Sequence, residues 1–135
     1  IGLSWASVLP PGPSRWTDVG FAKPGVWGAP HLAGSGPLAP GTSNALLLTH
    51  ANALSPALLV TGFVTQNTAL LGGILVPEPV LVSVANTDAG GGLSASLPVP
   101  GFAPVGLPIL FQYWIQDSAA TFGWSASNGL RGVIQ

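Results

Sequence analysis

The stretch Pro108-Ile109-Leu110-Phe111-Gln112-Tyr113-Trp114-Ile115-Gln116-Asp117 decides the fold. Read with the two-residue period of a β-strand, one face carries Ile109, Phe111, Tyr113 and Ile115, and the other carries Leu110, Gln112, Trp114 and Gln116. Aromatic and β-branched side chains suit a pleated, covered surface, and no other run in the chain is as bulky. The pattern predicts a central core strand with one fully buried face and one half-solvated face.

Outside this strand the chain is apolar and almost uncharged. Hydrophobic residues make up 47% of the 135 residues and charged residues only 5%, against about 25% charged residues in an average soluble domain. A net charge of −1 leaves little repulsion between copies, so self-association is expected. The lack of basic patches argues against nucleic acid and anionic membranes as partners. Gly, Pro, Ser and Thr break every apolar run, which excludes a transmembrane helix of about 18 residues or more.

Composition also bears on location. The chain has no Cys, so stability must come from packing rather than from disulfides. It begins at Ile1 and has no Met, which indicates either a mature N-terminus left by leader removal or a fragment. Its polar surface must come from Ser, Thr, Asn and Gln, as in many extracellular assemblies. We therefore expect a secreted, extracellular or cell-surface protein.

Short apolar runs between turn residues predict an all-β fold. Gly (19) and Pro (14) are spread along the chain, and no long segment has helical spacing. We expect a single antiparallel β-sandwich of about eight strands over residues 14–135. Residues 15–36 are predicted to be largely loop, with a short strand near 31–34. The other expected strands are 46–50, 56–65, 74–76, 80–84, 93–97, 109–116 and 130–134.

Particular residues define the turns and edges of this sandwich. Pro77 and Pro79 interrupt the chain before the strand at 80–84, which places that strand at a sheet edge or a crossover. Residues 93–97 alternate between apolar and serine side chains, so the apolar ones should point inward. Asp88 and Asp117 follow strands in turn contexts, where an Asp side chain accepts hydrogen bonds from nearby backbone.

The first thirteen residues are predicted to form an N-terminal extended arm. Residues 1–9 alternate between apolar and small side chains, and Pro10-Pro11-Gly12-Pro13 is a stiff spacer that cannot continue a paired central strand. Two interpretations remain open: an edge strand of the chain's own sandwich, or an arm that completes a neighbouring subunit's sheet. The residues expected to make the contact are Ile1, Leu3, Trp5, Val8 and Leu9.

Several stretches together resemble a known family. They are residues 16–20, 34–38, 57–62, 72–77, 111–117 and 125–130. From about Trp16 onward, the chain is similar to the small β-sandwich modules found, often C-terminally, in secreted proteins of planctomycetes and related environmental bacteria. The resemblance implies location and architecture and carries no established chemistry. Such modules usually trail a larger protein, so a module standing alone behind an extra strand favours a self-associating subunit.

Enzyme chemistry has little support in the residues. Only His31 and His50 could serve as a base, and the closest approach to a Gly-x-Ser-x-Gly elbow, at 123–127, lacks its second glycine. The four carboxylates stand mostly in turns, which argues against a glycosidase pair. No Cys or His series suggests a metal site, although a calcium site of Asp117 with loop carbonyls stays open. We expect no enzyme, no catalytic residues and no cofactor.

The five tryptophans are the remaining functional signal. Trp16, Trp27 and Trp124 are predicted to lie in loops, where they either plug the sandwich or a subunit contact, or form platforms that stack sugar rings. Low charge favours the first alternative. We expect a secreted structural subunit that assembles with copies of itself into a filament, tube or surface layer through sheet-edge and apolar contacts. The alternative is a carbohydrate-binding or adhesion module that recognises polysaccharide.

Overall fold

The structure, a computed structural model, describes residues 15–135 and confirms an all-β protein built of antiparallel sheets. The predicted arm, with Ile1, Leu3, Trp5, Val8 and Leu9, lies outside the described residues. The elements are β1 (Trp16–Gly20), β2 (His31–Ser35), β3 (Ser43–Thr49), β4 (Pro56–Gly62), β5 (Thr65–Leu70), β6 (Gly73–Pro77), β7 (Leu81–Asn86), β8 (Leu93–Pro98), β9 (Pro108–Gln116), η1 (Thr121–Gly123), β10 (Trp124–Ala126) and β11 (Gly129–Val133).

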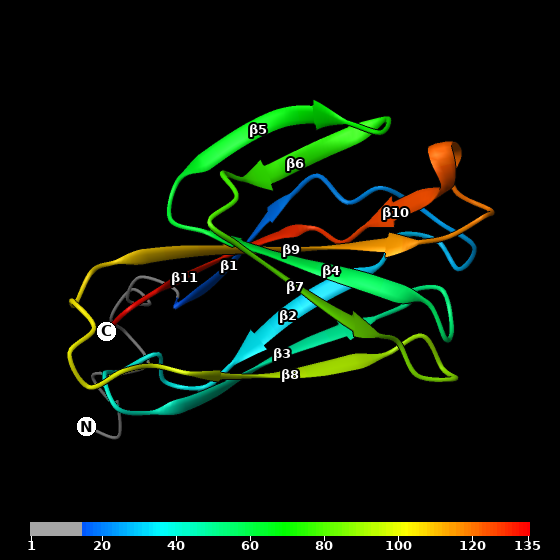
Figure 1. Ribbon diagram of the computed structural model, residues 1–135. Coiled ribbons are helices and arrows are strands. Elements are labelled where there is room, and N and C mark those ends of the chain that lie inside the picture. Colours follow the sequence, from blue (N-terminus) through cyan, green and yellow to red (C-terminus); the bar gives the residue numbers. More distant parts are fainter. Residues whose placement is uncertain (1–14) are drawn as a thin grey trace, which may run out of the picture.

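These strands form two packed sheets and a covering hairpin (Figure 1). The larger sheet has the order β1-β11-β9-β4-β7, with β10 also paired to β9. The smaller sheet has the order β2-β3-β8 and packs against one face of the larger sheet. The hairpin β5–β6 lies over the opposite face (Figure 1). The sandwich expectation is therefore confirmed, with a third, partial layer added to it.

The core between the two sheets contains the predicted inner face of β9. Phe111, Tyr113 and Ile115 are buried there against three leucines of the small sheet, Leu32, Leu46 and Leu48. On β8 the apolar side chains turn toward this core and Ser94 and Ser96 are exposed, as the alternation predicts. Burial of side chains of this size provides most of the driving force for the fold.

The other face of β9 differs from the prediction. Leu110, Gln112 and Trp114 are as buried as the inner face, with exposed fractions of 2%, 0% and 3%. The prediction that this face is half-solvated was therefore wrong, except at Gln116, which is exposed. The reason is the hairpin β5–β6, which covers this part of the sheet and packs Leu75 against Trp114.

Buried amide side chains join the layers. Gln112 pairs with β6 as a strand would: its Oε1 accepts from the Val76 N–H at 3.0 Å and its Nε2 donates to the Ile74 carbonyl at 3.0 Å. Asn128 joins the two sheets in the same way, since Oδ1 accepts from the Leu32 N–H at 2.8 Å and Nδ2 donates to the Leu32 carbonyl at 3.1 Å. Buried polar groups satisfied in this way fix one arrangement of the layers.

Residues 15–135 contain eleven strands in place of about eight. The strands missed are β1, β5 and β10. β5 is exposed along its whole length and has no apolar periodicity, so only its pairing with β6 defines it. β1 and β10 are short and are defined by their pairing. β1 pairs with β11 near the end of the chain, and β10 pairs with β9, which precedes it. Such pairings cannot be predicted from the local sequence alone.

Both predicted aspartate turns are confirmed. Asp88 accepts hydrogen bonds from the N–H groups of Gly90 and Gly92 at 2.9 and 2.8 Å. Asp117 accepts from the Ala119 N–H at 2.9 Å. Each carboxylate therefore holds the turn that follows it.

Burial of Tyr113 predicts a weakening of the fold at alkaline pH. Desolvation of the phenolate raises the pKa of Tyr113 above its ordinary value of 10.0. As the pH rises past 10, the unfolded chain loses this proton before the folded chain does, so the free energy of unfolding falls. We expect Tyr113→Phe to remove this part of the decline in urea titrations between about pH 8 and 11. An unchanged slope in the variant would contradict the assignment to Tyr113.

Candidate functional site

Strand β7 presents an open apolar edge. Within residues 15–135 it pairs with β4 alone, so the backbone groups on its other side have no strand partner in this part of the chain. The prolines before the strand predicted a sheet edge or a crossover between sheets, and the structure shows the edge. Four apolar side chains at and beside this edge are exposed: Val80 (65%), Leu81 (60%), Val82 (49%) and Val84 (70%). We call β7 and these four side chains the β7 edge.

The register with β4 shows how these side chains divide. Val82 lies opposite Val60, and Val84 lies opposite Leu58, so Val82 and Val84 point to the outer face of the large sheet. Leu81 points to the inner face, near the margin of the core. The β7 edge is therefore apolar on both faces.

An apolar groove of about 310 Å³ adjoins the β7 edge on the outer face. It lies where the hairpin β5–β6 leaves the large sheet uncovered. Its walls are leucines of the hairpin together with Leu58 and Val60 of β4, and Val82 belongs to both the groove and the β7 edge. Trp114 and Trp124 also line it, which gives the groove an aromatic surface.

Charge does little to protect this region. The chain has three cationic and four acidic residues, and two of these seven, Lys23 and Asp117, are buried. Strand β7 contains no charged residue and no proline, the two devices with which soluble proteins most often block an edge. The exposed charged residues are Arg15, Asp18, Glu78, Asp88 and Arg131.

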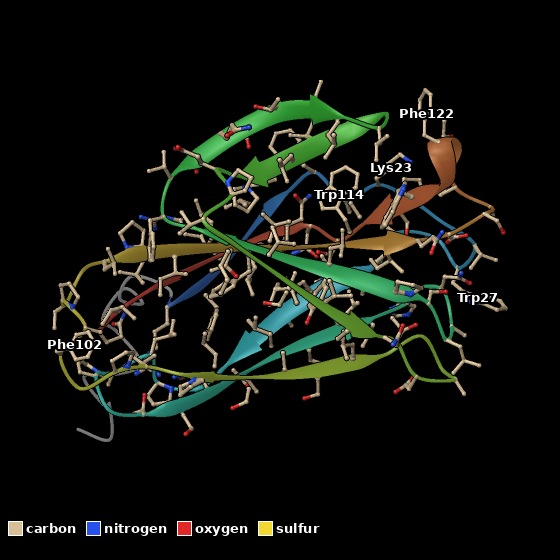
Figure 2. The ribbon with its side chains drawn as sticks, in the orientation of Figure 1. Lys23, Trp27, Phe102, Trp114 and Phe122 are labelled. Carbon is tan, nitrogen blue, oxygen red and sulfur yellow. The ribbon has the colours of Figure 1, made fainter. Side chains whose placement is uncertain are left out.

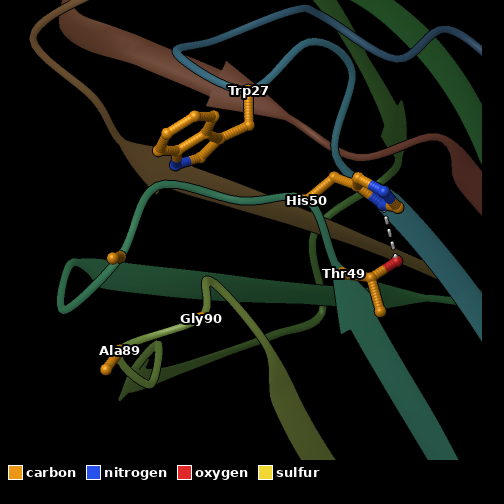
Figure 3. A pocket seen from close by; sticks show the side chains of 6 residues that line it. Trp27, Thr49, His50, Ala89 and Gly90 are labelled. Atoms are coloured by element: carbon orange, nitrogen blue, oxygen red, sulfur yellow. Dashed lines mark hydrogen bonds between the residues drawn. The ribbon is translucent and has the colours of Figure 1, made fainter.

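A second exposed feature is the turn that carries Trp27. Gly25 and Gly28 exchange backbone hydrogen bonds of 2.9 and 3.2 Å, so Val26 and Trp27 form the tip of a two-residue turn. The Trp27 side chain is 66% exposed and points away from the sandwich (Figure 2). It stands over a recess of about 470 Å³ (Figure 3).

The structure separates the three tryptophans that the sequence placed in loops. Trp16 begins β1 and is half-buried; its ring lies 6.3 Å from that of Phe111, and its Nε1 donates to the Gly36 carbonyl. Trp124 begins β10 and packs with Val60 and Trp114. For these two the loop assignment was wrong, and both serve packing. Of these three residues, Trp27 is the one that lies in a loop with most of its side chain exposed, whereas Trp124 is partly buried and lines the groove beside β7.

Groups for catalysis do not come together in the described part of the chain. His50 Nδ1 lies 3.2 Å from Thr49 Oγ1, and no hydrogen bond joins a histidine to a serine between residues 15 and 135. Ser125 is buried, and its Oγ has no partner among the described residues. Both oxygens of Asp117 accept from backbone N–H groups, of Val26 and Ala119. No cluster of three His, Asp or Glu side chains suitable for a metal occurs in this range.

Other exposed aromatics lie at the ends of the molecule. Phe102, 88% exposed, projects from a loop, and Phe122 projects from η1 at the opposite end of the sandwich (Figure 2). Between residues 15 and 135 no helix has the length and apolar character needed to cross a bilayer.

Comparisons of the chain with protein-family models, with curated proteins and with solved structures found no match.

Proposed function

We propose that this protein is a secreted structural subunit that associates with copies of itself through the β7 edge. The observation that carries the proposal is a strand with one edge unpaired within residues 15–135, with exposed apolar side chains on both faces and no charge along its length. Such an edge is a template for pairing with another chain. Main-chain hydrogen bonds to a neighbour would satisfy the backbone of β7, and the groove beside it would cover the neighbour's apolar side chains.

The topology favours an open assembly. The described chain enters the large sheet at β1, which is the edge strand opposite β7. An arm that precedes β1 therefore starts at one edge of the sheet, while the acceptor is the other edge. A contact between two different surfaces is heterologous, and repetition of it gives a filament unless the rotation closes a ring. In this proposal the alternating residues 1–9 of one copy pair with the β7 edge of the next.

Two lysines on β7 test the proposal. We expect Val82→Lys/Val84→Lys to weaken self-association by about 100-fold or more. An unpaired ammonium that leaves water costs several kcal/mol, and each 1.4 kcal/mol or so changes the association constant about tenfold. The matched control is Ser94→Lys/Ser96→Lys, which adds the same charge with the same spacing to exposed positions of β8. Sedimentation velocity over a concentration series, with electron microscopy of the concentrated protein, measures the difference.

The outcomes separate the parts of the proposal. A monomeric wild-type protein at high concentration, or equal behaviour of the two lysine pairs, would refute association through β7. Deletion of residues 1–9 tests the arm alone. Assembly that survives this deletion but not the β7 lysines would keep the edge and remove the arm.

A further inference from the structure

The Trp27 turn is held rigidly in place although its tip is exposed. Lys23 and Ala126 exchange backbone hydrogen bonds of 2.9 and 3.1 Å, which attaches the segment before the turn to β10. The buried Lys23 ammonium donates to the carbonyls of Thr121 and Trp124. Within the turn, the Val26 N–H donates to Asp117 Oδ2 at 2.8 Å. The indole of Trp27 is thus presented on a fixed support and not on a free loop.

Gly25 makes this support possible. A Cβ added at Gly25 would lie 2.2 Å from Asp117 Oδ2 and 2.9 Å from Ser125 Cβ. Only a glycine allows the turn to approach the buried carboxylate closely enough for the hydrogen bond to Val26. An exposed tryptophan held by buried polar contacts is an arrangement suited to binding, because little conformational freedom is left to lose.

The recess beneath Trp27 is built from three separate turns at one end of the sandwich. Thr49 and His50 come from the end of β3, Ala53 from the following loop, and Ala89 and Gly90 from the turn after β7 (Figure 3). His50 follows β3 with a positive φ of 61°, so the chain turns sharply at this residue. The volume of 470 Å³ falls within the range of about 300–1,000 Å³ typical of small-ligand sites.

The chemistry of the lining selects a neutral, hydroxylated ligand. No charged residue lines the recess. The one carboxylate in the adjoining turn, Asp88, already accepts from Gly90 and Gly92. What the recess offers is an aromatic face, small apolar walls, the Thr49 hydroxyl and the His50 ring. An aromatic face covers the apolar face of a sugar ring, and side chains with neutral donors and acceptors bind its hydroxyls.

We propose that the Trp27 recess binds a neutral pyranose unit of a polysaccharide. The ring of the sugar packs on the Trp27 indole, and its hydroxyls hydrogen-bond to Thr49 Oγ1 and to the His50 ring. The lining of the recess contains no residue of the β7 edge. Sugar binding is therefore independent of self-association, and each can fail without the other.

Affinity electrophoresis of the full chain tests this site. The gels contain one neutral polysaccharide each (xylan, mannan, β-1,3-glucan, cellulose ether or amylose), and polygalacturonate serves as the charged comparison. We expect retardation by at least one neutral polysaccharide, and Trp27→Ala to weaken it by about tenfold or more, as for a central tryptophan in other binding sites. Phe102→Ala is the matched control, because it removes another exposed aromatic side chain, at the other end of the sandwich, and should leave retardation unchanged (Figure 2).

Folding of the variants is checked by thermal melting, and neither substitution should change the melting temperature by more than a few degrees because both side chains are exposed. Retention by polygalacturonate alone, or by none of the polysaccharides, would overturn the proposal. Equal retention of the wild-type protein and Trp27→Ala would overturn it as well. Thr49→Val, which removes one hydroxyl donor and keeps the volume, should weaken binding by a smaller factor of about three to ten.

Discussion

Replacement of Gln112 by leucine is expected to lower the free energy of unfolding by about 4 kcal/mol or more. Gln112 has no exposed surface and makes four hydrogen bonds. Besides its two bonds to β6, its Nε2 donates to the Ser127 carbonyl at 3.1 Å and its Oε1 accepts from Trp114 Nε1 at 3.1 Å. Leucine fills a similar volume but leaves four buried polar groups without a partner, each at about 1–3 kcal/mol.

Gln116→Leu on the same strand is the control for this substitution. Gln116 is exposed, so the same chemical change should alter stability by no more than about 0.5 kcal/mol. Urea unfolding followed by tryptophan fluorescence measures both variants, because Trp114 lies beneath the hairpin β5–β6. Hydrogen exchange adds a local test: in Gln112→Leu, the amides of β6 should exchange faster than those of β3. Equal stability of the two leucine variants would show that Gln112 does not hold the hairpin.

Gly91→Ala is expected to cost about 2–4 kcal/mol of stability, the second large effect. Gly91 has a φ of +75°, a conformation that L-residues rarely adopt. In addition, an added Cβ would lie 2.0 Å from the carbonyl oxygen of Ala51, which is backbone and cannot rotate away. The Ala51 N–H also donates to the Gly91 carbonyl at 3.1 Å, so a shift of the turn breaks this bond too.

The neighbouring residue is a close control. A Cβ at Gly90 would meet only Asp88 Oδ1, at an ordinary contact distance of 3.5 Å. Gly90→Ala should therefore change the midpoint of thermal unfolding little, whereas Gly91→Ala should lower it by roughly 6–20 °C, at about 3–5 °C per kcal/mol for a domain between the small and large size classes. If both variants have the same melting temperature, the turn between β7 and β8 is more adaptable than its close contacts indicate.

The low charge of the chain has different consequences for the two proposed surfaces. At the β7 edge, the absence of charge removes the usual barrier to pairing with another copy. At the Trp27 recess, it leaves a lining without fixed charge, which suits a neutral sugar. A subunit with both surfaces would form an assembly able to adhere to polysaccharide.

The two proposed surfaces could be predicted from the sequence only in part. The prolines before residues 80–84 indicated a sheet edge or a crossover, but nothing in that run showed that its apolar side chains would be exposed. Trp16, Trp27 and Trp124 all stand near Gly or Pro, so the local sequence placed them alike in loops. Trp16 is instead partly covered by its contact with Phe111, and Trp124 by its contact with Trp114. Both contacts are made with β9, which the sequence around each tryptophan does not reveal.

The amino-acid sequence by itself determined the all-β class, the inner face of β9, the two aspartate turns and the shortage of charge. These follow from alternation, turn chemistry and composition, which are properties of neighbouring residues or of the whole chain. Only the tertiary structure decided that a hairpin covers the second face of β9, that β7 stays open and that Trp27 alone among the three loop candidates is exposed. Each of these depends on which distant segments pair, as Trp16 does with Gly132 and Gln112 with β6, and such pairing is set by the packing of the whole molecule.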